Sequence, residues 1–155
     1  MRTYDNSDKW KDDELNNAAN VLSELLNNKK LPDTDAEALN IITEFLAEYS
    51  SYKAEEDLKR ALLITVTDLG YIIDKLNSYE IMHTYNPNDY WKGAELRAAA
   101  RKIGEVANHK GLHNKDKKTL LPIEELLTGY YEFNTHEDLK KQLVKTIEDF
   151  QHIIK

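Results

Sequence analysis

The sequence predicts an all-α protein in which two consecutive three-helix units pack as one compact six-helix bundle with pseudo-twofold symmetry. Three observations predict this fold: an internal repeat, apolar residues spaced three and four apart, and the composition. The chain of 155 residues is 41% hydrophobic and has only five glycines and three prolines, which suits a helical globule.

The internal repeat is the strongest of these observations. Shifting the chain by 81 positions aligns residues 3–74 with 84–155 without a gap, and 28 of the 72 aligned pairs are identical. We therefore expect one unit in residues 1–77, and a linker with the second unit in residues 78–155. The linker lacks the glycine and proline of a flexible connection, so we expect a single structural domain. A short stack of the two units is the alternative.

The first helix is expected over residues 8–27, with Ser7 or Asp8 as its N-terminal cap. The second helix begins after Pro32, because Thr34 and Glu37 have the spacing of a capping box. Apolar stripes on the first two helices predict the core of the first unit. They consist of Leu15, Ala18, Ala19, Leu22, Leu25, Leu26, Leu39, Ile42, Leu46 and Tyr49.

The third helix is expected over residues 54–76, with a stripe formed by Leu58, Leu62, Thr65, Leu69, Ile72, Ile73 and Leu76. Leu63 and Ile64 widen this stripe, which predicts that this helix is more central than its counterpart in the second unit. The second unit repeats the three helices. Pro122 replaces Ile41 there, so we expect its middle helix to begin at the proline.

The tryptophans and the charge also follow the repeat. Trp10 and Trp91 occupy one repeat position, and with Tyr4 and Tyr85 we expect them to close one end of each core rather than to stack on a ligand. The formal charge is −7, from 21 basic and 28 acidic side chains. The first 77 residues hold sixteen of the acids and nine of the bases. This balance disfavours direct nucleic-acid binding and favours a basic partner.

The sequence contains no cysteine, no apolar segment of a signal peptide and no long apolar stretch, so we expect a cytoplasmic protein without a membrane segment. We also expect no cofactor, because the glycines form no phosphate-binding loop. His109 and His113 are weak metal candidates, since Gly111 between them favours a loop. Asp68 and Asp149 are matched acids that could act as an acid–base pair, but a structural role, with hydrogen bonds from each acid's own unit, is favoured.

One helix face in the first unit is typical of a protein interface. Glu37, Glu44 and Glu48 lie within about 40° of one another on a helix with 100° per residue. Ile41 lies among them and Tyr52 lies at their edge. Acidic side chains around an apolar centre can attract a basic partner and then hold it. An ordinary solvated helix face is the alternative interpretation.

We therefore predict a non-enzymatic inhibitor or immunity-type protein, bacterial or phage in origin, that occludes a basic protein partner such as a toxin, nuclease or nucleic-acid-binding protein. The predicted partner-binding residues are Asp12, Asp13, Glu37, Ile41, Glu44, Glu48, Tyr52, Glu55 and Tyr131. A self-associating scaffold is one alternative, and a metal protein or enzyme with a site between the units is another. We expect a monomer or a homodimer.

Overall fold

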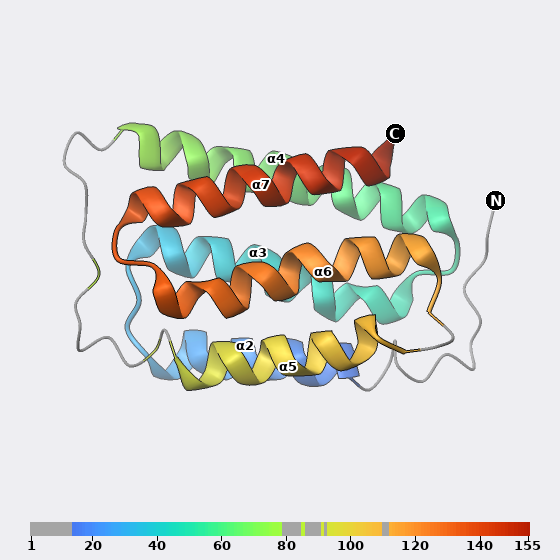
Figure 1. Cartoon of the computed structure of the whole chain (residues 1–155), viewed down its shortest axis with the longest axis horizontal. Helices are drawn as coiled ribbons and strands as arrows, with labels where there is room; N and C mark the ends of the chain where they lie inside the picture. Colours follow the sequence, from blue (N-terminus) through green and yellow to red (C-terminus); the bar gives the residue numbers. More distant parts are fainter. Residues whose placement is uncertain (1–13, 79–84, 86–90, 92, 110–111) are drawn as a thin grey trace.

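The structure is a computed structural model that describes residues 14–78, 85, 91, 93–109 and 112–155. Within these residues the chain forms six α-helices and no β-strand, so the all-α prediction is confirmed (Figure 1). The helices are α2 (Glu14–Asn28), α3 (Asp33–Glu48), α4 (Glu55–Ser78), α5 (Ala94–Ala107), α6 (Asn114–Gly129) and α7 (His136–Ile154). Short 3-10 helices, η1 (Tyr49–Ser51) and η3 (Tyr130–Glu132), precede α4 and α7.

The six helices form a closed ring of neighbours in the order α2, α3, α4, α7, α6 and α5, with α5 packing back on α2. Figure 1 shows this ring as three layers, with α2 and α5 in one outer layer, α3 and α6 in the middle, and α4 and α7 in the other outer layer. A compact bundle is therefore present, and the alternative of two stacked units does not apply.

The predicted apolar stripes form the core of this bundle. Nearly all of the predicted core positions in α2, α3 and α4 are buried, while Leu26 and Ile73 are partly buried against them. The second unit buries matching residues, including Leu96, Leu120 and Leu139. Each fully buried leucine stabilises the fold by about 1.5–3 kcal/mol relative to an exposed one. In the described part of the chain, no helix has both the length and the apolar character needed to cross a membrane.

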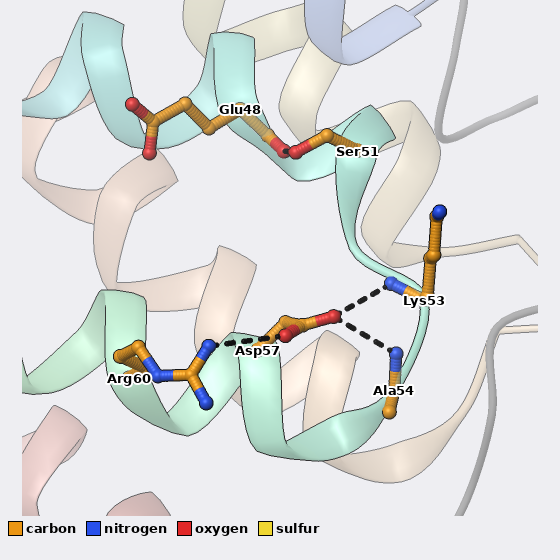
Figure 2. A network of polar contacts seen from close by, with 6 residues as sticks. All are labelled: Glu48, Ser51, Lys53, Ala54, Asp57 and Arg60. Atoms are coloured by element: carbon orange, nitrogen blue, oxygen red, sulfur yellow. Dashed lines mark hydrogen bonds and ion pairs between the residues drawn. The ribbon is translucent and has the colours of Figure 1, made fainter.

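The same local device starts α4 and α7. The Asp57 carboxylate accepts hydrogen bonds from the backbone N–H groups of Lys53 and Ala54, at 2.9 and 3.2 Å (Figure 2). Asp138, its match in the first turn of α7, accepts the equivalent bonds from the N–H groups of Asn134 and Thr135, at 2.8 and 3.1 Å. Each carboxylate therefore satisfies free amides at a helix N-terminus, and its negative charge also suits that end of the helix.

One predicted helix cap and one predicted helix start are wrong. Helix α3 begins at Asp33, directly after Pro32 as predicted, but the predicted capping box is wrong, because Pro32 is the N-cap residue and Thr34 already lies in the first turn. Helix α6 begins at Asn114 and continues through Pro122. The proline ring is buried there, and the carbonyl left without its amide belongs to the exposed residue Lys118. Core packing thus outweighs the local preference of proline. The predicted caps Ser7 and Asp8 lie outside the described residues.

The prediction that the third helix of the first unit is the more central one is also wrong. Helix α4 lies in an outer layer with α7, and the middle layer consists of α3 and α6. Leu63 and Ile64 are 53% and 58% exposed. The two side chains thus place an apolar strip on the outer surface of α4.

Candidate functional site

Two buried aspartates link the middle helices of the two units. Asp35 of α3 and Asp116 of α6 are both fully buried, and they occupy the same repeat position. The hydroxyl of Tyr49 donates a hydrogen bond to Asp116, and the hydroxyl of Tyr130 donates one to Asp35. Each aspartate is therefore bound by a tyrosine from the other unit, which joins the units at both ends of the middle layer.

Asp35 has two further polar neighbours. The Tyr85 hydroxyl donates a hydrogen bond of 2.6 Å to Oδ1, and Nε2 of His136 lies 3.1 Å from Oδ2. Burial, followed by the charge of Asp35, raises the pKa of Tyr85 and that of Tyr130 well above the ordinary tyrosine value. Trp91 is also buried and packs edge-on against both tyrosine rings, as expected for an aromatic that closes the core. Because Asp35 and Tyr130 are closed to solvent, this network holds the fold together rather than binding a substrate.

The matched acids that the sequence singled out have a different environment. Asp68 and Asp149 are both only partly buried. Asp149 lies 3.8 Å from Nζ of Lys145, one turn away on α7, so its polar partner comes from its own unit, but as an ion pair rather than the predicted hydrogen bond. Asp68 lines a surface groove between α3 and α4.

We call this feature the α3–α4 groove. One part of it is a cavity of about 120 Å³ whose lining includes Ile41, Glu44, Glu48, Ile64, Thr65 and Asp68. A second part, of about 260 Å³, shares Glu48 and Ile64 and extends to Tyr52, Asp57 and Arg60. Figure 2 shows Glu48 at the end of α3 and Arg60 in the first turns of α4, on the two walls of this second part.

Three predicted partner-binding residues line the groove, and a fourth forms its wall. Ile41, Glu44 and Glu48 face the first cavity, as expected from their shared helix face. Tyr52 is only 6% exposed, so its ring belongs to the wall rather than to an open edge. Burial, together with the charges of Glu48 and Asp57, raises the pKa of Tyr52.

The remaining predicted residues lie apart from the groove or already have a charged partner. The Glu37 carboxylate is 2.6 Å from Nζ of Lys75, and Glu55 is 2.5 Å from Nζ of Lys115 in the other unit. The Glu55 side chain is only 14% exposed, so this pair joins the two units. Asp12 and Asp13 lie outside the described residues.

Tyr131 lies on η3 in the second unit and is 55% exposed. The guanidinium carbon of Arg97 lies 3.9 Å from the centre of its ring. This cation–π contact gives the exposed ring a local partner on α5. Tyr131 is thus a surface residue with no part in the α3–α4 groove.

Glu44, Glu48 and Asp68 differ from these paired acids. No Lys, Arg or His side chain among the residues that the structure describes lies within ion-pair distance of any of the three. Glu44 accepts a hydrogen bond of 3.2 Å from the Asn40 amide on its own helix. The groove therefore combines three carboxylates with the apolar side chains of Ile41 and Ile64.

The second unit has the same acids with a cation between them. Glu125 and Asp149 match Glu44 and Asp68, but Lys145 stands at the position of Ile64. Nζ of Lys145 lies 2.7 and 2.8 Å from the two oxygens of Glu125 and 3.8 Å from Asp149. The hydrogen bond to Glu125 is the main cause of a raised pKa at Lys145. The second unit thus neutralises its acids with its own lysine.

A neighbouring cavity of about 440 Å³ lies between α6 and α7. Its lining is rich in basic side chains around Leu121 and includes Lys115, Lys118, His152 and Lys155, with Glu125 and Asp149 at one side. Leu121 is 39% exposed. The α6–α7 face therefore carries basic character where the corresponding face of the first unit is acidic.

The two candidate histidines lie at the ends of consecutive helices. His109 follows the end of α5 and His113 is the N-cap residue of α6, and both are exposed. Among the described residues, no three His, Asp or Glu side chains are grouped as metal ligands.

Comparisons with protein-family models, with curated proteins and with solved structures find no match to this chain.

From the sequence alone, Ile64 and Asp68 were not assigned to one site with the acids of α3, and the two buried aspartates were not identified. A signal was present for the aspartates, because Asp35 continues the buried face of Leu39 and Ile42 at helical spacing and is identical in both units. The signal for Ile64 was its replacement by Lys145 in the second unit. From the sequence we interpreted Ile64 as part of a wider core stripe instead.

Proposed function

We propose that the protein is a non-enzymatic binding protein that neutralises a basic partner protein by covering part of its surface with the α3–α4 groove. The observation that carries this proposal is the contrast between the two units. The acids Glu44, Glu48 and Asp68 line an apolar-centred groove with no cationic partner in the described part of the chain, whereas Glu125 and Asp149 are paired with Lys145.

The physical argument rests on how such a surface attracts and holds a partner. Carboxylates speed the encounter with a basic protein, and this effect weakens as salt rises. Ile41 is partly buried and Ile64 is 58% exposed, so they offer apolar area at the centre of the acids. Burial of that area against a partner would stabilise the complex after the encounter. A toxin, a nuclease or a nucleic-acid-binding protein has the basic surface that this groove requires.

The setting we propose is the cytoplasm. The chain contains no cysteine, which suits a reducing compartment. The excess of acids in the first unit also suits the capture of a basic protein at the moderate ionic strength of a cell.

The test is capture of partners by the tagged full chain from its native host, with a matched charge control. Glu44→Lys and Glu48→Lys together reverse two charges in the groove. Glu105→Lys and Glu148→Lys reverse two exposed charges elsewhere. We expect the wild type and the control pair to retain a basic protein at low salt, and the groove pair to lose it. Equal retention by the groove pair and the control pair would rule out the groove as the binding face.

Self-association is the second candidate, and the opposite charges of the two faces favour it. The acidic α3–α4 groove of one molecule could receive the basic α6–α7 face of another, around Lys118 and Lys155. Such a head-to-tail contact predicts a mass that rises with protein concentration in sedimentation equilibrium. A monomer at all concentrations would remove this candidate.

A further inference from the structure

The two units allow a direct comparison, because they share two acids at this place in the fold and differ in the residue between them. Glu44 and Asp68 match Glu125 and Asp149, and all four side chains lie at the boundary between the middle and outer helices. In the second unit these acids hold the Lys145 ammonium, with two oxygens of Glu125 at 2.7 and 2.8 Å. The second unit thus shows how acids at these two positions bind the ammonium group of a lysine.

The first unit has the acceptors for an ammonium group but lacks the lysine. Glu48 adds a third carboxylate where the second unit has Gly129, so the negative charge is larger. Ile64 supplies an apolar surface at the point where the lysine begins in the second unit. An ammonium group prefers charged oxygen acceptors, and its methylene stem prefers apolar contacts.

The size of the first cavity matches one side chain. Its volume is about 120 Å³. It is the smaller of the two parts of the groove, so we take a single side chain as its occupant.

We propose that the α3–α4 groove binds one lysine side chain of the basic partner, with its ammonium between Glu44 and Asp68 and its methylenes against Ile41 and Ile64. This inference rests on the proposed function and names the group that the groove recognises. The acids of the first unit receive from the partner the cation that the second unit supplies itself through Lys145.

The test introduces a lysine into the groove by substitution of one of its own residues. Ile64→Lys recreates the arrangement of Lys145 and should block the groove. Leu63→Lys is the matched control, because it adds the same charge at a neighbouring exposed position that does not line the cavity. Both positions are more than half exposed, so both variants should fold.

The probe is a short synthetic peptide with one lysine between leucines, titrated into isotope-labelled full chain and followed by NMR. A peptide with norleucine in place of lysine is the peptide control. We expect saturable shifts in residues 41–48 and 61–68. Ile64→Lys should weaken binding by about tenfold or more, the scale of a charge-assisted hydrogen bond, and Leu63→Lys should weaken it much less.

Three results would overturn the inference: equal weakening by Ile64→Lys and Leu63→Lys, equal binding of the norleucine peptide, or no saturable shift at millimolar peptide. A reciprocal variant, Lys145→Ile, should open a second site and produce new peptide-dependent shifts near Glu125 and Asp149. The absence of those new shifts would also contradict the proposed lysine site.

The same variants separate this inference from the proposed function. If Glu44→Lys with Glu48→Lys abolishes partner capture while Ile64→Lys leaves it intact, the binding face stands and the lysine site is wrong. If neither change affects capture, the proposed function itself is wrong. Loss of capture in both, with retention in Leu63→Lys, supports the two together.

Discussion

Removal of the Tyr130 hydroxyl tests the buried network that joins the two units. Tyr130→Phe keeps the ring in the core but removes one of the hydrogen bonds to the fully buried Asp35. Tyr85 and His136 remain next to this carboxyl. A hydrogen bond to a charged group contributes about 1.5–3 kcal/mol, and a buried acceptor that loses a partner retains its desolvation cost. We therefore expect the free energy of unfolding to fall by about 1.5–3 kcal/mol.

Thermal and urea unfolding of the full chain would measure this loss. At about 2–4 °C per kcal/mol for a chain of this size, Tm should fall by roughly 3–12 °C. Tyr131→Phe is the matched control, since this neighbouring tyrosine is 55% exposed and should change stability by less than about 0.5 kcal/mol. If the two variants unfold at the same temperature, the hydroxyl of Tyr130 has no structural role and the reasoning about the network is refuted.

Two further predictions concern pH. The pKa values of Tyr85 and Tyr130 are raised above the ordinary 10.0. Their contribution to the free energy of unfolding is therefore complete below pH 10 and is lost as pH rises above that value. In urea unfolding, Tyr130→Phe should reduce this alkaline slope by about 1.4 kcal/mol per pH unit, and an unchanged slope would contradict the assignment. The second prediction concerns Asp57, whose pKa is lowered below 3.8 by backbone hydrogen bonds. Its contribution to the free energy of unfolding is therefore present above pH 3.8 and is lost as pH falls through the folded-state pKa. Asp57→Asn should flatten the acid limb of the stability profile, whereas the same acid limb in the variant and the wild type would show that the cap contributes nothing.

Helical periodicity predicted the elements and the core well. The stripes on α2, α3 and α4 are buried as expected, because one apolar face at helical spacing has to pack against other helices. The same rule failed at Leu63 and Ile64, since an apolar residue beside a stripe is not buried unless a neighbouring helix covers it. The position of α4 in an outer layer could not be deduced from its own sequence.

The buried acids show a second limit of sequence reasoning. Asp35 lies in register with the buried face of α3, yet an acid at such a position is normally assigned to the surface. Its main partner, Tyr130, comes from the other unit, so the hydrogen bond depends on how the units pack. Pro122 was misjudged for a related reason, because tertiary packing keeps α6 continuous through it.

The candidate site was predicted in part. Ile41, Glu44 and Glu48 share one helix face, and the sequence identified them as a group. Ile64 and Asp68 complete the groove from a different helix, which the periodicity of α3 could not indicate. Comparison of the two units could have identified Ile64, since it faces the acids that match the partners of Lys145 in the second unit.

The most direct test of the central claim is a hydrogen–deuterium exchange footprint of the full chain with and without a captured basic partner. We predict slower exchange in residues 41–48 and 61–68, which form the two walls of the α3–α4 groove, and unchanged exchange in the matched residues 122–129 and 142–149. Protection of the matched residues instead, or equal protection of both units, would contradict the assignment of the groove as the binding face.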